Sequence, residues 1–264
     1  GSYYLGIAGK WIQALENAEL YEERGFKEHR DDIIYLKAKA YDNQLSFPDA
    51  AKQYLILAKL YPSHKRANLA LQRAIKLSSS ENLSEVQAEA LELKGNRIKN
   101  NSVKIASYVK AAEINIENDR DSEALRLSNK INSLKTRGIE SLKAALAVAK
   151  IEMKAGNSSR GIDRIERIIA TGKKNRRKYP ANEYSEVIGE ANFLLAKDEY
   201  ERLIDYRIVD RSGTLAEKIA FKERIFVQMV KKFDEAAGIR GQKWVPEANF
   251  RSADAATQFA SELV

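Results

Sequence analysis

Residues 31–62 read DDIIYLKAKAYDNQLSFPDAAKQYLILAKLYP, and this stretch decides the fold class. It contains two runs of helical periodicity, 31–43 and 48–60, separated by a short polar turn. Pro62 predicts the end of the second run, because proline disfavours helical geometry in the residue before it. Pro48 falls in the first turn of that run, where a helix can accept a residue without an N–H. The stretch therefore predicts an antiparallel helical hairpin.

Small and aromatic residues recur at fixed positions of this hairpin. Counted from Asp31 as the first position, they are Ala38, Tyr41, Ala50, Tyr54 and the closing Pro62. Small residues let two helices approach closely, and aromatic residues fill the space between them. On these positions the stretch, with its best repeat at 31–64, resembles the tetratricopeptide (TPR) family. The resemblance implies an α-solenoid with a right-handed superhelical twist.

The small position of the second helix recurs along the chain at steps of 36 to 38 residues. A near-constant step is the signature of a stacked array. We therefore expect an all-α fold of about twelve helices without a sheet. Residues 1–172 are expected to form the array, with a partial first repeat, and 173–264 a helical section that continues or caps it. The recurring residues are Ala14, Ala50, Ala88, Ala124 and Gly161.

The composition excludes some classes of protein and leaves others open. The chain has 264 residues, 45 Lys and Arg against 37 Asp and Glu, and a formal net charge of +8. It has no cysteine, which excludes disulfides and thiolate metal sites. No apolar run approaches the roughly 18 residues of a membrane helix. Gly1 and Ser2 resemble a cloning scar, so we expect the natural chain to be longer.

No pattern of catalytic or metal-binding residues is evident. The two histidines, His29 and His64, stand among polar neighbours and are expected on the surface. Asp31 and Asp32 stand at the start of a helical run, where carboxylates are favoured. Phosphate-loop and zinc-protease motifs are missing. We therefore expect a protein that is not an enzyme and holds no cofactor or metal.

Several residues carry predictions of local structure. The sequences at 84–87 and 214–217 read as capping boxes that open helices. An apolar stripe at four-residue spacing is expected to be the buried face of one helix. Both tryptophans are expected in the core. The stripe is Phe221, Ile225, Met229 and Phe233, and the tryptophans are Trp11 and Trp244.

The TPR resemblance also implies that five positions of each first helix point into the concave face. Because many of these residues are basic, we expect them to hold an acidic or extended protein segment, and no small-molecule substrate. The alternative is that some are solvated or covered by the next helix. The positions are Asp32, Tyr35, Lys39, Asp42 and Asn43; Arg66, Leu69, Arg73, Lys76 and Leu77; and Lys143, Leu146, Lys150, Met153 and Lys154.

A second candidate site is the densest run of positive charge, at 173–178. It could bind nucleic acid or another anionic surface, or be a solvated loop between repeats. Tyr179 is the only aromatic neighbour, and acidic residues are interspersed along most of the chain, so protein is favoured over nucleic acid as the partner. The basic members are Lys173, Lys174, Arg176, Arg177 and Lys178.

The C-terminal section carries a more particular resemblance. It follows the pattern W-x3-A-x-[YF]-R-x7-FA with Trp244, Ala248, Phe250, Arg251, Phe259 and Ala260. This pattern is similar to the C-terminal ends of TPR proteins associated with gliding motility and envelope machinery in gliding and predatory bacteria. The resemblance implies a scaffold in a bacterial envelope or motility assembly, in the periplasm or at the envelope. A cytoplasmic location stays open.

Overall fold

The computed structural model describes residues 9–208, 212–238 and 245–262. The chain divides into two compact units, one ending at Ile131 and the other beginning at Asn132. Every regular element within the described ranges is a helix.

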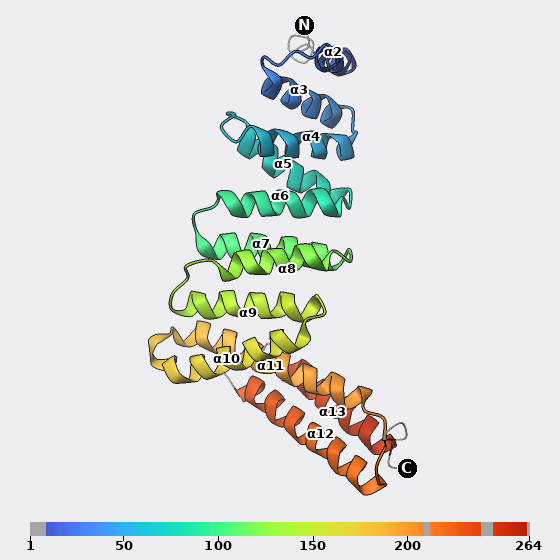
Figure 1. The fold of residues 1–264 in the computed structure, drawn as a ribbon, viewed down its shortest axis with the longest axis vertical. Helices are drawn as coiled ribbons and strands as arrows, with labels where there is room; N and C mark the ends of the chain where they lie inside the picture. Colours follow the sequence, from blue (N-terminus) through green and yellow to red (C-terminus); the bar gives the residue numbers. More distant parts are fainter. Residues whose placement is uncertain (1–8, 209–211, 239–244, 263–264) are drawn as a thin grey trace. The chain divides into compact units, whose positions relative to one another are not determined.

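The first unit is a series of helices in which α2 to α7 each pack against the next (Figure 1). Its core is formed by side chains of α3, α4, α5 and α6. The last helix, α8, ends at the first residue of the second unit. The helices are α2 (Trp11–Glu23), α3 (Arg30–Asn43), α4 (Phe47–Leu60), α5 (Ala67–Ser80), α6 (Ser84–Arg97), α7 (Asn101–Ile116) and α8 (Asp121–Asn132).

The second unit repeats this sequential packing, and its long helix α11 contacts α9, α10, α12 and α13. Buried Lys222 of α12 pairs with Glu262, just beyond α13, and Glu262 also accepts a hydrogen bond from the backbone N–H of Ile208. This contact joins the end of the chain to the rest of the unit. The elements are α9 (Ile139–Lys154), α10 (Ser158–Asn175), the 3₁₀ turn η1 (Arg176–Lys178), α11 (Ala181–Asp205), α12 (Leu215–Gly238) and α13 (Val245–Ser261).

These elements confirm the predicted fold class. The described residues contain twelve α-helices, α2 to α13. The helix predicted at 139–154 has the observed bounds of α9, and the one predicted at 31–43 begins one residue earlier. The superhelical hand and the boundary after residue 172 stay predictions. The alternative of a loop at 173–178 is wrong, because α10 continues to Asn175 and the 3₁₀ turn follows directly.

The recurring small residues are all buried, as the close approach of paired helices requires. Ala14, Ala50 and Ala124 have no exposed surface. Gly161 shows why the position must be small: a methyl group there would lie 2.9 Å from the carbonyl oxygen of Ala149 and would also meet Met153. The helices of each hairpin can approach closely because nothing larger separates them.

The two capping boxes have different outcomes. Thr214 accepts a hydrogen bond from the N–H of Glu217, and Glu217 accepts one from the N–H of Thr214, so this box is confirmed. At α6 the N-cap is Leu83, and the Ser84 hydroxyl instead accepts a hydrogen bond from Arg120 at 3.3 Å. The capping box predicted at Ser84 is wrong, because the serine hydroxyl is hydrogen-bonded to a side chain from a neighbouring hairpin.

Three other residues differ from expectation. The His64 side chain is buried, with Nε2 lying 3.3 Å from a carboxylate oxygen of Asp32. Trp11 is only partly buried. Ile225, Met229 and Phe233 are buried as predicted, but Phe221 is exposed and packs against Tyr206. The other tryptophan, Trp244, lies outside the described residues.

Candidate functional site

The predicted partner-binding residues of the first unit gather where α3 and α5 lie next to each other. We call Tyr35, Lys39, Arg66, Leu69 and Lys76 the α3/α5 face. The guanidinium of Arg66 sits over the Tyr35 ring, 4.2 Å from its centroid. Leu69 projects with 58% of its surface exposed. Lys39 and Lys76 make no ion pair with any described residue.

Arg73 was predicted for the same face, but it is held by another residue of the chain. Its Nε and Nη2 donate to the two carboxylate oxygens of Asp42, at 2.8 and 2.6 Å. The Tyr54 hydroxyl donates to the same carboxylate at 3.1 Å. Burial alone would raise the pKa of Asp42, but the hydrogen bonds from Arg73 and Tyr54 outweigh it and bring the pKa below its usual value. Arg73 therefore has a structural role in joining α3 to α5.

The second unit uses its predicted partner residues in the same way. Lys150 pairs with Glu190 of α11 at 2.7 Å, and Lys143 pairs with Glu183 of α11. Leu146 lies in the core between α9, α10 and α11. Its prediction as a partner contact is wrong, since the next helices cover it.

The remaining predicted positions also divide into buried and accessible ones. Asp42 and Leu77 are buried, while Met153 is half-buried against α10. Asn43 is exposed and donates to the backbone oxygen of Lys39. Asp32 and Lys154 are exposed as well.

The basic run at 173–178 is exposed apart from its single asparagine, and two of its members face other elements of the second unit. Lys173 forms an ion pair of 3.5 Å with Glu235 of α12, and both side chains are well exposed. The Arg176 guanidinium lies 5.8 Å from the ring centroid of Tyr184. Lys174, Arg177 and Lys178 are exposed to solvent.

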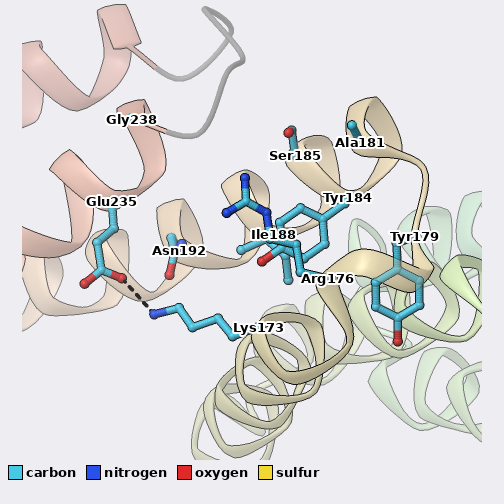
Figure 2. Close-up of a pocket in the computed structure, with 10 residues that line it drawn as sticks. All are labelled: Lys173, Arg176, Tyr179, Ala181, Tyr184, Ser185, Ile188, Asn192, Glu235 and Gly238. Atoms are coloured by element: carbon cyan, nitrogen blue, oxygen red, sulfur yellow. Dashed lines mark ion pairs between the residues drawn. The ribbon is translucent and has the colours of Figure 1, made fainter.

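These two basic residues border a hollow of about 840 Å³ within the second unit. We call it the α10–α12 hollow. Figure 2 shows Lys173 and Glu235 on one side, and Arg176 beside Tyr184 on the other. Tyr184 stacks on Tyr179 with the ring planes 12° apart. The wall is completed by Ile188 and Asn192 of α11.

Asn192 has an unusual position in this hollow. It is only 2% exposed, and its Nδ2 has no hydrogen-bond partner within the part of the chain that the structure describes. Figure 2 shows Asn192 between Glu235 and Arg176, with its amide oxygen on the side of Lys173 and its nitrogen on the side of Arg176. A buried donor without a partner is costly, so such atoms are rare in folded proteins. In the sequence, Asn192 stands out as a polar residue within the apolar helical stretch 191–196. Helical periodicity alone does not predict that its amide is buried without a partner.

Residues 9–208, 212–238 and 245–262 contain no group of three or more His, Asp or Glu side chains arranged to hold a metal ion. None of their helices is long and apolar enough to cross a bilayer.

The hairpins with buried small residues define a TPR-like helical repeat array. No protein-family model matches the chain, and no curated protein does. Among solved structures, it is similar to a tetratricopeptide repeat protein from Parabacteroides merdae ATCC 43184, with a TM-score of 0.34 and 14% identity. The similarity covers 97% of this chain and 96% of that one. The TPR-like description of this chain rests on its own helices.

Proposed function

We propose that this protein is a non-enzymatic scaffold that holds a segment of another protein on the α3/α5 face. The observation that carries the proposal is the 58% exposure of Leu69 on a helix that also carries Lys76 and is preceded by Arg66. An exposed leucine can anchor a partner, and Arg66, Lys39 and Lys76 would attract acidic residues of that partner. The partner is therefore an acidic, extended segment.

Several other predicted binding residues form ion pairs within the chain, and this supports the choice of the α3/α5 face. Arg73, Lys143 and Lys150 are held by carboxylates of the chain itself. Lys39 and Lys76 make no such pair with a described residue, although the charge of Lys39 also helps to lower the pKa of Asp42. Nucleic acid is the second candidate, and its support is the exposed run of Lys174, Arg177 and Lys178. Its weakness is the scarcity of aromatic side chains on which bases could stack.

The proposal extends to a bacterial envelope or motility assembly, with a periplasmic or envelope location. This extension is supported by the resemblance of the pattern at 244–260 to the C-terminal ends of TPR proteins of gliding and predatory bacteria. Among the matching residues, Ala248 is buried between helices, and the Arg251 guanidinium lies 5.0 Å from the Tyr200 ring centroid. Fractionation of the native cells, followed by detection of the protein, tests this location directly.

The binding face can be tested with two matched leucines. Leu69 on α5 and Leu60 on α4 are almost equally exposed, at 58% and 59%. Leu69→Asp should abolish capture of partners from a lysate of the native cells, while Leu60→Asp should leave it intact. Both variants should melt as the parent does, because neither side chain is buried. Equal capture by both variants would overturn the proposed face.

A further inference from the structure

The α10–α12 hollow combines features that the repeat architecture does not require. It contains a buried amide donor without a partner, two cations at its border and an aromatic pair. No described side chain or backbone oxygen accepts a hydrogen bond from Asn192 Nδ2, so an acceptor that enters the hollow would supply the missing partner.

The chain itself indicates which acceptor. The Glu235 carboxylate lies 3.5 Å from the Lys173 ammonium at the border of the hollow. Both side chains are largely exposed, at 60% for Lys173 and 40% for Glu235, so water screens this pair strongly. A weak internal ion pair of this kind can be exchanged for a stronger one. A carboxylate that also accepts the hydrogen bond of Asn192 would replace Glu235 on Lys173.

We propose that the α10–α12 hollow binds an acidic side chain of a partner protein, with Glu235 as its internal competitor. The incoming carboxylate accepts a hydrogen bond from Asn192 Nδ2 and pairs with Lys173. Arg176 stands on the opposite side and adds a second positive charge. Ile188 and Tyr184 contact the apolar stem of the acidic side chain. This site is separate from the α3/α5 face, so each can fail without the other.

The proposal predicts opposite effects for two substitutions. Glu235→Gln removes the competitor and should tighten binding of an acidic peptide. Asn192→Leu removes the buried donor and should weaken that binding by about tenfold. The same leucine should not lower the melting temperature of the free protein, because replacing an unpaired buried amide by an apolar group of similar size removes a desolvation cost. An asparagine with only a structural role would instead destabilise the fold when it is lost.

The test uses fluorescence polarisation of the full chain with a fluorescein-labelled hexaglutamate peptide whose C-terminus is amidated. Hexaglutamine is the neutral control peptide. Glu201→Gln is the matched protein control, because it makes the same change in net charge at an exposed residue of α11 that does not line the hollow. The proposal expects hexaglutamate alone to bind, tightened by Glu235→Gln and unchanged by Glu201→Gln.

Several results would overturn it. Equal tightening by both glutamine variants would mean that net charge alone attracts the peptide. An Asn192→Leu variant that binds the peptide as well as the parent would show that the Asn192 amide takes no part in binding. A labelled oligothymidylate with six phosphates is the comparison for nucleic acid. If it binds more tightly than hexaglutamate and depends equally on Asn192, the hollow recognises phosphate instead. If neither probe binds, the proposal is contradicted as well, and water is the occupant of the hollow.

Discussion

Arg73 and Asp42 lie 31 residues apart in the sequence and share two hydrogen bonds across α3 and α5. The Asp42 carboxylate is 9% exposed, so it depends on these bonds for its charge to be tolerated. Removing one partner of a buried ion pair costs more than the pair contributes, since the remaining charge is left without compensation. Arg73 is therefore unsuitable as a probe of partner binding, despite its predicted inward position.

Substitution of Arg73 should consequently act on stability. Arg73→Met should lower the free energy of unfolding by about 2–3 kcal/mol, because it leaves the Asp42 carboxylate with Tyr54 as its remaining donor. Urea denaturation measures this change. Lys76→Met, on the same helix at an exposed position without an ion pair, should change stability by less than about 0.5 kcal/mol. Equal losses in the two variants would show that the Asp42 pair is not structural.

Glu92 allows a prediction about pH. Hydrogen bonds from Arg126 and Lys130 outweigh the effect of burial and lower the pKa of Glu92 from 4.5 to about 2. A carboxyl whose pKa is lower in the folded state stabilises the fold above its unfolded pKa, and this contribution disappears as the pH falls through the folded pKa. Glu92→Gln should therefore be less stable than the parent at pH 7, by about 1–2 kcal/mol after solvent screening.

The difference between parent and Glu92→Gln should shrink as the pH falls from about 4.5 to about 2. Urea denaturation at a series of pH values measures it. Glu85→Gln is the control, because Glu85 is exposed on the same helix and makes no ion pair with a described residue. A difference that stays constant down to pH 2 would contradict the role assigned to Arg126 and Lys130.

At the scale of the helix pair, the small residues set the distance between neighbours. Ala50 has no exposed surface, so a larger side chain there must displace the facing helix. Ala50→Leu should cost about 1–3 kcal/mol through overpacking. Ala170→Leu, at an exposed position of α10, should cost little. Thermal melts that coincide for both variants and the parent would show that the repeat register is wrong.

The sequence was sufficient to predict the helices and their buried small residues because both depend on local periodicity. It was not sufficient to predict which charges remain available. That depends on which residue of the next repeat lies opposite, as with Lys150 and Glu190. The capping box expected at Ser84 was wrong for the same reason, since Arg120 from another hairpin engages the serine. The periodicity of a single helix does not predict its contacts with the next repeat.

At the scale of the whole molecule, the net charge of +8 is not a measure of a binding surface. Some of the basic side chains form ion pairs between successive repeats, such as Lys59 with Glu89 and Lys143 with Glu183. The basic residues that make no ion pair with a described residue include Lys76 on the α3/α5 face and Lys174, Arg177 and Lys178 in the run at 173–178. Association with an acidic partner should therefore depend on these few residues more than on the total charge.

The last prediction concerns how stability is distributed along the chain. In a repeat array each helix contacts mainly its neighbours, so stability is approximately a sum of local contributions. Two compact units, ending and beginning at Ile131 and Asn132, favour local opening over a single global transition. Gly161→Ala would press against Met153 and the Ala149 carbonyl, at the contact between α9 and α10. Its effect should thus be confined to the second unit.

Native-state hydrogen exchange can resolve this by residue range. Gly161→Ala should raise amide exchange within 139–205 and leave that of 30–97 unchanged. Ala50→Leu should do the reverse, because Ala50 belongs to the core of α3 to α6. The two substitutions act as controls for each other, since each destabilises one unit by overpacking. If either one raises exchange over both ranges equally, the chain unfolds as one cooperative body, and the additive behaviour expected of a repeat array does not apply to it.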